Sequence, residues 1–253
     1  PRGAHAQRRG RDDRQQAQEC DREPADSQEQ PGAALATGRA LFALGHPAQA
    51  MAVFKRALDD LGDGDPDLSG RLRAGHAAAL WLAGLPEGGT VATTAPPASA
   101  DAPGDRALLA LHAIEGAMRG VSCTEVRDLA ARALDRGALL DDETADGLTY
   151  YLATAALAVA EDLSTAEAGL TAAVEEANAR GSVLGFATAS HIRAMAILMR
   201  GRVQDAMADA RNSLGVERDG WRLGLGGARL VLSHCLVETG DLTAAVTQVE
   251  AAE

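Results

Sequence analysis

From about residue 33 onward, apolar residues recur along the chain at spacings of three and four, the periodicity of a helix that buries one face. A residue typical of a tight turn interrupts this pattern at regular intervals. The turn positions are separated by 39, 36, 41, 40 and 39 residues, and they are Gly45, Gly84, Gly120, Glu161, Gly201 and Gly240. A period near forty residues, sustained six times, predicts a repeat built from helices.

The residues before each turn position share a pattern of size. Four residues before the turn the side chain is a large aliphatic one in every copy except Gly116, and three residues before it the side chain is always apolar. Seven residues before the turn the side chain is small, and this column comprises Gly38, Ala77, Ala113, Thr154, Ala194 and Ser233. Small and bulky residues at helical spacing predict a helix, here called helix A of each repeat, that meets a neighbour closely.

A second helix, helix B, is predicted after each turn. Five residues after the turn position stand Ala50, Ala166, Ala206 and Ala245, and the third repeat fits only after a shift of one residue. The second repeat lacks this pattern, because the segment 86–104 carries four prolines. A proline inside a helix costs about 3 kcal/mol, so we predict a Pro/Gly-rich loop over 86–104.

Local signals predict where several helices begin and end. Ser164 with Glu167 three residues later is typical of a capping box, and Asp241 is a predicted N-cap. Gly181 is a predicted helix stop. Pro47 follows a turn at a place where a first-turn proline is tolerated.

The ends of the chain differ from its repeats. Residues 1–31 are rich in Arg, Gln, Asp and Glu without a periodic apolar face, which predicts a disordered leader, with a frayed amphipathic helix as the alternative. The first residue is Pro1, and residues 243–253 resemble a helix without a stop signal, so we expect a fragment of a longer protein. The predicted organisation is a leader (1–31), the first repeats (32–85), the loop (86–104) and the remaining repeats (105–253), truncated at the C-terminus.

Composition and charge narrow the classes of function. Aromatic residues make up only 3% of the chain, which favours an all-α fold over a β-rich one. The net charge is −12 and Lys55 is the only lysine, so we expect no direct contact with nucleic acid, whose binding depends on neutralised phosphates. Three scattered cysteines and the lack of an apolar run of about 18 residues predict a cytoplasmic chain without disulfides, zinc or a membrane segment.

The columns of the first repeat resemble the tetratricopeptide motif, at Gly38, Leu41, Gly45, Ala50, Phe54 and Ala57. With their longer period, the segments Gly181–Leu214 and Gly220–Ala252 are similar to the helical region of large ATP-binding LuxR-family regulators, the MalT-like transcription activators. The resemblance implies a right-handed α-solenoid of about six helical hairpins, with a concave groove that binds an effector or a protein partner. The abundance of Ala and Arg suits an actinobacterial source.

In that family a nucleotide-binding module precedes the repeats and a helix-turn-helix follows them. This sequence contains no GxxxxGK[ST] loop and no basic recognition helix. The resemblance therefore implies a sensor or scaffold region without a cofactor of its own, in which ATP and DNA are bound only by other domains of the parent. A free-standing tetratricopeptide adaptor for a peptide or protein partner is the alternative.

The candidate chemistry is that of binding. No nucleophile–base pair and no HExxH motif are recognisable, so we predict that the chain is not an enzyme. Tyr150, Tyr151 and Trp221 lie near the starts of predicted A helices, which line the concave side of such superhelices. With His191 and Arg193 they form the candidate ligand- or partner-binding set, and burial of the rings in the core is the alternative.

Overall fold

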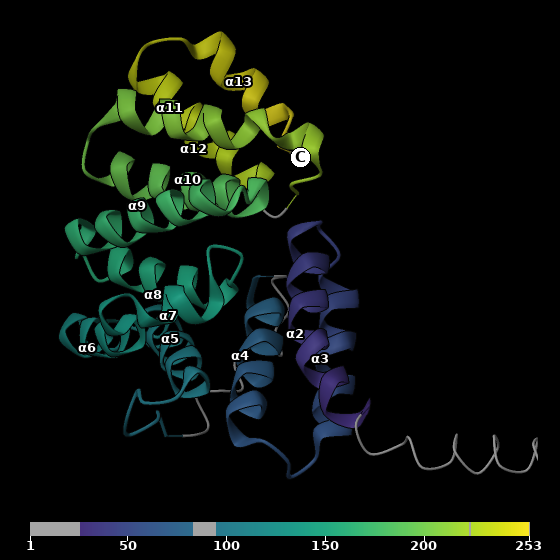
Figure 1. Cartoon of the computed structure of the whole chain (residues 1–253). Coiled ribbons are helices and arrows are strands. Elements are labelled where there is room, and N and C mark those ends of the chain that lie inside the picture. Colours follow the sequence, from purple (N-terminus) through teal and green to yellow (C-terminus); the bar gives the residue numbers. More distant parts are fainter. Residues whose placement is uncertain (1–25, 83–94, 223, 253) are drawn as a thin grey trace, which may run out of the picture.

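The structure is a computed structural model, which describes residues 26–82, 95–222 and 224–252 (Figure 1). Within these ranges the chain is all-α and contains no strand. The helices are α2 (Asp26–Ala43), α3 (Pro47–Leu61), α4 (Pro66–Leu82), α5 (Pro103–Met118), α6 (Cys123–Leu134), α7 (Ala138–Glu143), α8 (Leu148–Val159), α9 (Leu163–Arg180), α10 (Val183–Met199), α11 (Val203–Gly215), α12 (Leu225–Glu238) and α13 (Leu242–Glu250). No helix in the described residues is both long and apolar enough to cross a membrane.

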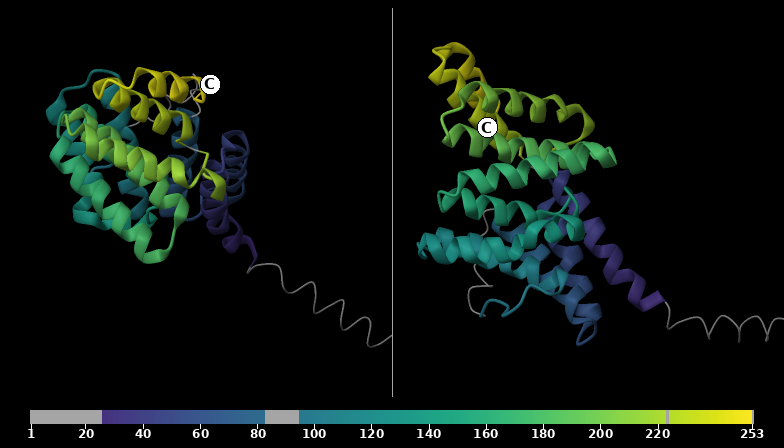
Figure 2. Two further views of the ribbon diagram at one scale, coloured as in Figure 1. Left: turned by 90° about the horizontal axis from the view of Figure 1, so that it is seen from above. Right: turned by 60° about the vertical axis from the view of Figure 1, so that its left-hand side comes forward.

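The helices pack in the order of the sequence. The predicted A helices are α2, α4, α5, α8, α10 and α12, and each of them contacts the next one in this series. Most B helices also contact the A helix that follows them, as α3 contacts α4 and α9 contacts α10. Helices α5 to α13 form successive layers, and α2 and α3 lie to one side of these layers (Figures 1 and 2).

The predicted turns are confirmed wherever the structure describes them. Each has a positive φ between 63° and 86°, at Gly45, Gly120, Glu161, Gly201 and Gly240, while Gly84 lies outside the described residues. At every one of these turns, the N–H of the turn residue donates to the carbonyl three residues earlier. The next N–H donates to the carbonyl five residues before it, which completes the Schellman arrangement of a helix C-terminus.

Several predicted helix ends are confirmed and one is wrong. Asp241 caps α13 by accepting a hydrogen bond from the Ala244 N–H at 3.1 Å, and α9 ends at Gly181 in the left-handed conformation. The predicted capping box is absent. Asp162, rather than Ser164, accepts the bond from the Thr165 N–H that opens α9, because the helix begins directly after the Glu161 turn, two residues earlier than the motif requires.

The boundaries of the predicted leader and loop also shift. Helix α2 begins at Asp26, so residues 26–31 of the predicted leader are helical, and the rest of the leader lies outside the described residues. Residues 95–102 of the predicted loop contain no helix, and α5 begins at Pro103, where a proline in the first turn is tolerated. The short helix α7 was not predicted. In the sequence it follows α6, the second helix of the third repeat, and precedes α8.

The small column seven residues before each turn is buried in all six copies. In the first copy the reason is steric, because a Cβ atom on Gly38 would lie 2.4 Å from the ring of Phe54. Phe54 in turn stands under Gly75 of α4, where an added Cβ would approach the same ring to 3.1 Å. The fully buried Phe54 ring therefore fills the space that two glycines of successive A helices leave open.

A second small column lies at the start of the A helices, and the sequence pattern did not reveal it. Sixteen residues before the turn stand Gly104, Ala145, Gly185 and Gly224, all of which are buried. A Cβ on Gly104 would lie 2.6 Å from the carbonyl oxygen of Asp67 in α4, and one on Gly224 would lie 2.7 Å from the ring of His191 in α10. Successive A helices thus approach each other closely at their N-terminal ends.

The Gly38–Phe54 contact predicts that alanine substitutions at two glycines of α2 change the stability of the chain in opposite directions. Gly38→Ala is expected to destabilise the chain by about 1–3 kcal/mol, because the methyl group overlaps a ring that cannot retreat. Gly32→Ala in the same helix has nothing within 4 Å of the new Cβ and is expected to stabilise by about 0.5–1 kcal/mol through helix propensity. Urea unfolding of both variants measures the difference, and equal effects would contradict the packing described here.

The Glu161 turn predicts that glycine is better at this position. Glu161 is a non-glycine residue with a φ of 63°, a conformation that costs roughly 1–2 kcal/mol for residues with a Cβ atom. Glu161→Gly is therefore expected to raise the free energy of unfolding by about 1 kcal/mol. A Cβ atom added at Gly201 would have no described atom within 4 Å, so the reciprocal change, Gly201→Glu, is expected to cost a similar amount through its backbone conformation. Thermal unfolding of the pair tests this, and a destabilised Glu161→Gly variant would be the contrary result.

Candidate functional site

A cavity of about 610 Å³ lies between the first hairpin and the central repeats. Its walls come from α2, from residues 144–148 before and at the start of α8, and from the α9–α10 connection with the first turns of α10. Small and aliphatic side chains form much of the surface, among them Ala36, Ala40, Leu148 and Leu184. A cavity of this size and character is typical of a site for a small, mainly apolar molecule.

Charged groups stand around this cavity in pairs. Arg39 on α2 donates to a carboxylate oxygen of Glu143 at 2.9 Å, and the Glu143 side chain is only 4% exposed. The same carboxylate accepts a hydrogen bond from the Thr149 hydroxyl at 2.6 Å. Glu143 is therefore fully engaged, and the Arg39 pair attaches the first hairpin to the third and fourth repeats, far away in the sequence.

The opposite wall is organised around Asp146. Its carboxylate accepts a hydrogen bond from the Ser182 hydroxyl at 2.5 Å and pairs with Arg180. Ser182 is also the N-cap of α10, because its side chain accepts from the Gly185 N–H. Arg180 also pairs with Glu176 at 3.2 Å and remains 42% exposed, so part of its guanidinium stays within reach of a ligand at this wall.

The connection between α2 and the rest of the chain has a second point of contact. The N–H of Arg222 donates to the carbonyl of Ala43 at the end of α2, at 3.1 Å. A Cβ on Gly45 would lie 2.8 Å from the Cβ of Arg222, so the turn after α2 touches the α11–α12 connection closely. Two contacts with later repeats therefore hold α2 beside the cavity. One is the Arg39–Glu143 pair, and the other is the hydrogen bond from Arg222 to the end of the helix.

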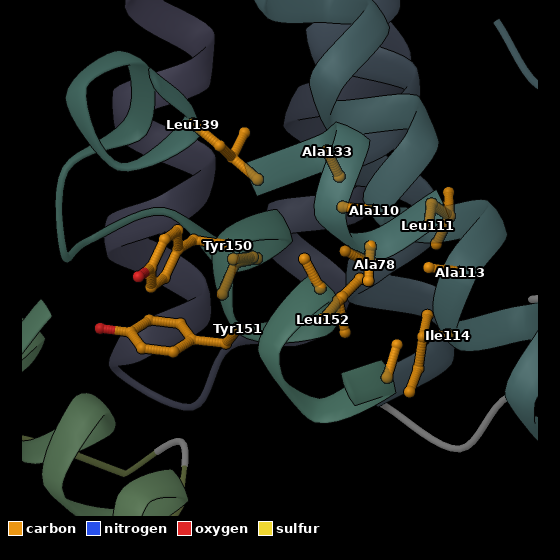
Figure 3. Close-up of a cluster of buried hydrophobic side chains, with 14 of the residues drawn as sticks. Ala78, Ala110, Leu111, Ala113, Ile114, Ala133, Leu139, Tyr150, Tyr151 and Leu152 are labelled. Carbon is orange, nitrogen blue, oxygen red and sulfur yellow. The ribbon is translucent and has the colours of Figure 1, made fainter. Parts of the chain in front are cut away.

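Tyr150 and Tyr151 are buried, with 2% and 5% of their surface exposed. Their rings meet edge to face with centroids 5.8 Å apart, and their hydroxyl groups point away from the aliphatic side chains of the core (Figure 3). The Tyr150 hydroxyl donates to the carbonyl of Gly169 at 2.7 Å, and the Tyr151 hydroxyl donates to that of Ala145 at 2.6 Å. Burial raises the pKa of Tyr150 to about 12 and also raises that of Tyr151, so both remain protonated donors.

These two rings therefore occupy different places relative to the predicted binding surface. Tyr151 contributes to the wall of the cavity, although little of it is accessible. Tyr150 is not among the residues around the cavity and packs in the core. Both rings are almost completely buried, so neither offers an exposed face on which a ligand could stack.

Trp221 and His191 form a second group, near the start of α12. Trp221 is completely buried and donates from its indole N–H to the hydroxyl of Thr188 at 3.0 Å. The His191 ring lies 6.1 Å from the Trp221 ring, tilted by 59°, and is enclosed by Gly224 and Gly227. Among the described residues, no group forms a hydrogen bond with the buried Nδ1 atom of His191, and burial lowers the pKa of this imidazole to about 4.

Arg193 is part of an ion pair between α10 and α11. Its guanidinium donates to both carboxylate oxygens of Asp209, at 2.7 and 2.9 Å. The hydrogen bond and the charge of Asp209 raise the pKa of Arg193, and the Asp209 side chain is only 8% exposed. This bidentate geometry fixes the two helices in register.

The five residues predicted as one site are thus divided among four places. Tyr151 reaches the cavity, Tyr150 lies in the core, and His191 and Trp221 pack together under α12, while Arg193 joins two helices. The residues around the cavity that sequence reasoning missed are Arg39, Asp146, Arg180 and Ser182. The repeated columns of the sequence did not indicate these residues, because the cavity forms where repeats far apart in the sequence meet.

Within the described ranges, no group of three or more His, Cys, Asp or Glu side chains is arranged to hold a metal ion. A comparison of the sequence with known protein families finds no match, and a comparison with curated proteins finds none either.

The buried His191 predicts a loss of stability in mild acid. Its pKa is lowered from 6.5 to about 4, so the folded state holds the imidazole neutral, and this contribution to stability is complete above pH 6.5. As the pH falls from 7 to 5, the free energy of unfolding is expected to decrease by about 2 kcal/mol because of this residue.

The measurement is urea unfolding at a series of pH values, compared with the variant His191→Gln. His76 and His112 also have pKa values lowered by burial, so part of the dependence is expected to remain in the variant. The difference between the two proteins isolates His191. An identical pH dependence in both would show that the imidazole is accessible to protons in the folded state.

Proposed function

We propose that this chain is a non-catalytic binding region built as an α-solenoid of about six tetratricopeptide-like hairpins. Two observations support this proposal. Each A helix contacts the next one, and each described turn has a residue in the left-handed conformation at the same position of the repeat. Such an arrangement buries the apolar stripe of one hairpin against its neighbour and leaves extended surfaces for partners. A right-handed superhelical course is part of this proposal.

The function proposed for this region is to sense an effector and to transmit its presence to neighbouring domains. One observation carries it: the cavity of about 610 Å³ is lined jointly by the first hairpin and by repeats whose residues lie more than a hundred positions later. An occupant would contact both parts at once. Binding would therefore change how firmly α2 is held on the central repeats, and a hairpin that is held more firmly can transmit that change.

The chemistry of the walls suggests what the effector is. Apolar contact is available from Ala36, Ala40 and Leu148, and the guanidinium of Arg180, which also pairs with Asp146 and Glu176, keeps an exposed part that can donate hydrogen bonds. An amphipathic molecule with an aliphatic or aromatic body and one group that accepts hydrogen bonds meets both requirements. A protein partner could present the same chemistry through a side chain.

By the family resemblance, we propose that the parent is a LuxR-family regulator, whose ATP-binding and DNA-binding domains lie outside this chain. A free-standing adaptor for a peptide or protein partner is the second candidate, and it requires only the repeat surfaces. The coding DNA on either side separates the two. A phosphate-binding loop upstream and a helix-turn-helix downstream select the regulator, whereas translation signals close to both ends select the adaptor.

The cavity is tested by filling it. Ala40 on α2 lies in the cavity wall, so Ala40→Phe is expected to weaken the binding of the anionic, aromatic probe 8-anilinonaphthalene-1-sulfonate at least tenfold, measured by fluorescence. Ala48→Phe on α3 adds the same ring at an exposed position outside the cavity and is expected to leave the affinity unchanged. Equal affinities of the two variants for the probe would show that the probe binds at another place.

The sensing role is tested in the parent protein with the same pair of substitutions. Ala40→Phe is expected to abolish the response to the effector while the DNA-binding activity of the parent is retained, and Ala48→Phe is expected to respond normally. A parent in which the repeat region can be deleted without any change in regulation would exclude the sensor.

A further inference from the structure

The connection between α7 and α8 holds a threonine in a backbone conformation that is usual only for glycine. Thr144, directly after α7, has a φ of 59° and a ψ of 178°. Asp135 and Arg136 also have positive φ values, but with ψ values of 58° and 24° they lie in the left-handed helical region. Residues with a Cβ atom tolerate that region better than the conformation of Thr144, whose β-branched side chain adds to the crowding. The connection is therefore strained.

The chain after Thr144 is held by the later repeats. The N–H of Ala145 donates to the carboxylate of Glu176 on α9 at 2.9 Å, and the carbonyl of Ala145 accepts a hydrogen bond from the Tyr151 hydroxyl at 2.6 Å. The carboxylate of Asp146 is held by the connection between α9 and α10. This side of the connection therefore has a fixed position that does not depend on the first hairpin.

The chain before Thr144 is held by the first hairpin. Glu143, the last residue of α7, is buried, and its charge is paired with Arg39 of α2. The Thr149 hydroxyl also donates to this carboxylate, but a neutral group does not replace a cation. A buried carboxylate that loses its cation is unfavourable, because its charge is then neither paired nor hydrated. Departure of α2 would therefore drive Glu143 toward water.

We propose that Arg39, Glu143 and Thr144 form a latch that couples the docking of the first hairpin to the shape of the cavity. While Arg39 holds Glu143, Thr144 stays in its strained conformation. When α2 leaves, Thr144 relaxes to a negative φ, which turns the chain before it relative to the chain after it by roughly 120° and carries Glu143 toward solvent. Thr144, Ala145 and Asp146 all line the cavity, so the same rotation changes its wall.

This inference deepens the proposed sensing role, and it rests on that role only for the use of the latch. A ligand that holds the cavity wall in place would keep Thr144 strained and Glu143 within reach of Arg39. The latch itself requires no ligand, so it is tested on the empty chain. A failure of the chain to bind the fluorescent probe would count against the sensing role and would leave this test unaffected.

The strain is measured by comparing Thr144→Gly with Thr144→Ala. Both substitutions remove the hydroxyl group, which accepts a hydrogen bond from the Asp146 N–H at 3.4 Å, but only glycine also removes the Cβ atom. Hydrogen exchange of the backbone amides of α2 is expected to be slower in the glycine variant by roughly threefold or more, because strain no longer opposes docking. At an unstrained position glycine would have the opposite effect, since it gains more conformational freedom on opening.

Removal of Arg39 tests whether the ion pair maintains the strain. In the Arg39→Met background Thr144 is expected to be relaxed already, so Thr144→Ala is expected to be at least as stable as Thr144→Gly in urea unfolding. Glu161→Gly and Glu161→Ala are the matched controls, because Glu161 has a positive φ but does not line the cavity. At this position glycine is expected to be the more stable in both backgrounds, with equal exchange of α2.

Two results would overturn the inference. One is exchange of α2 that is as fast or faster in Thr144→Gly than in Thr144→Ala, which would show that the strain is not coupled to docking of the first hairpin. The other is a preference for glycine at position 144 that persists undiminished in the Arg39→Met background. That result would show that the Arg39–Glu143 pair does not hold Thr144 in its strained conformation.

Discussion

The close approach of successive A helices is the constraint on which the rest of the structure depends. Two columns of small residues make it possible, one near the middle of each A helix and one at or just before the beginning of the last four, as Gly38 and Gly104 illustrate. Because few aromatic side chains are available, the core is filled by short helix-to-helix distances instead of by large rings. Where a ring does enter, as Phe54 does, glycines on both neighbouring helices leave room for it.

The cavity exists because one hairpin departs from nearest-neighbour packing. Arg39 on α2 pairs with the buried Glu143, and the end of α2 accepts a hydrogen bond from Arg222. These contacts place small residues of α2 opposite the connection between α9 and α10. The effector site that we propose is therefore a property of the assembled array.

Much of the fold could be predicted from the sequence because it depends on local patterns that recur in each repeat. The left-handed turns were recognisable from glycine spacing, and even Glu161 could be placed by register alone. The site could not be predicted in the same way. Arg39 and Asp146 occupy no repeated position, and the contacts that bring their walls together join distant repeats. The aromatic residues were conspicuous in the sequence mainly because they are rare, and the structure uses Tyr150 and Trp221 as packing.

The Arg39–Glu143 pair also bears on how the chain folds. Most contacts in this array join neighbours in the sequence, so each hairpin can form early and growth can start at any repeat. The two partners of this pair are 104 residues apart, and closing so long a loop carries an entropic cost that local contacts avoid. Docking of α2 is thus a late step that follows formation of the central hairpins. Local unfolding of the first hairpin is consequently expected to require less free energy than unfolding of any other hairpin. The central repeats would then unfold together, whereas the first hairpin could open by itself.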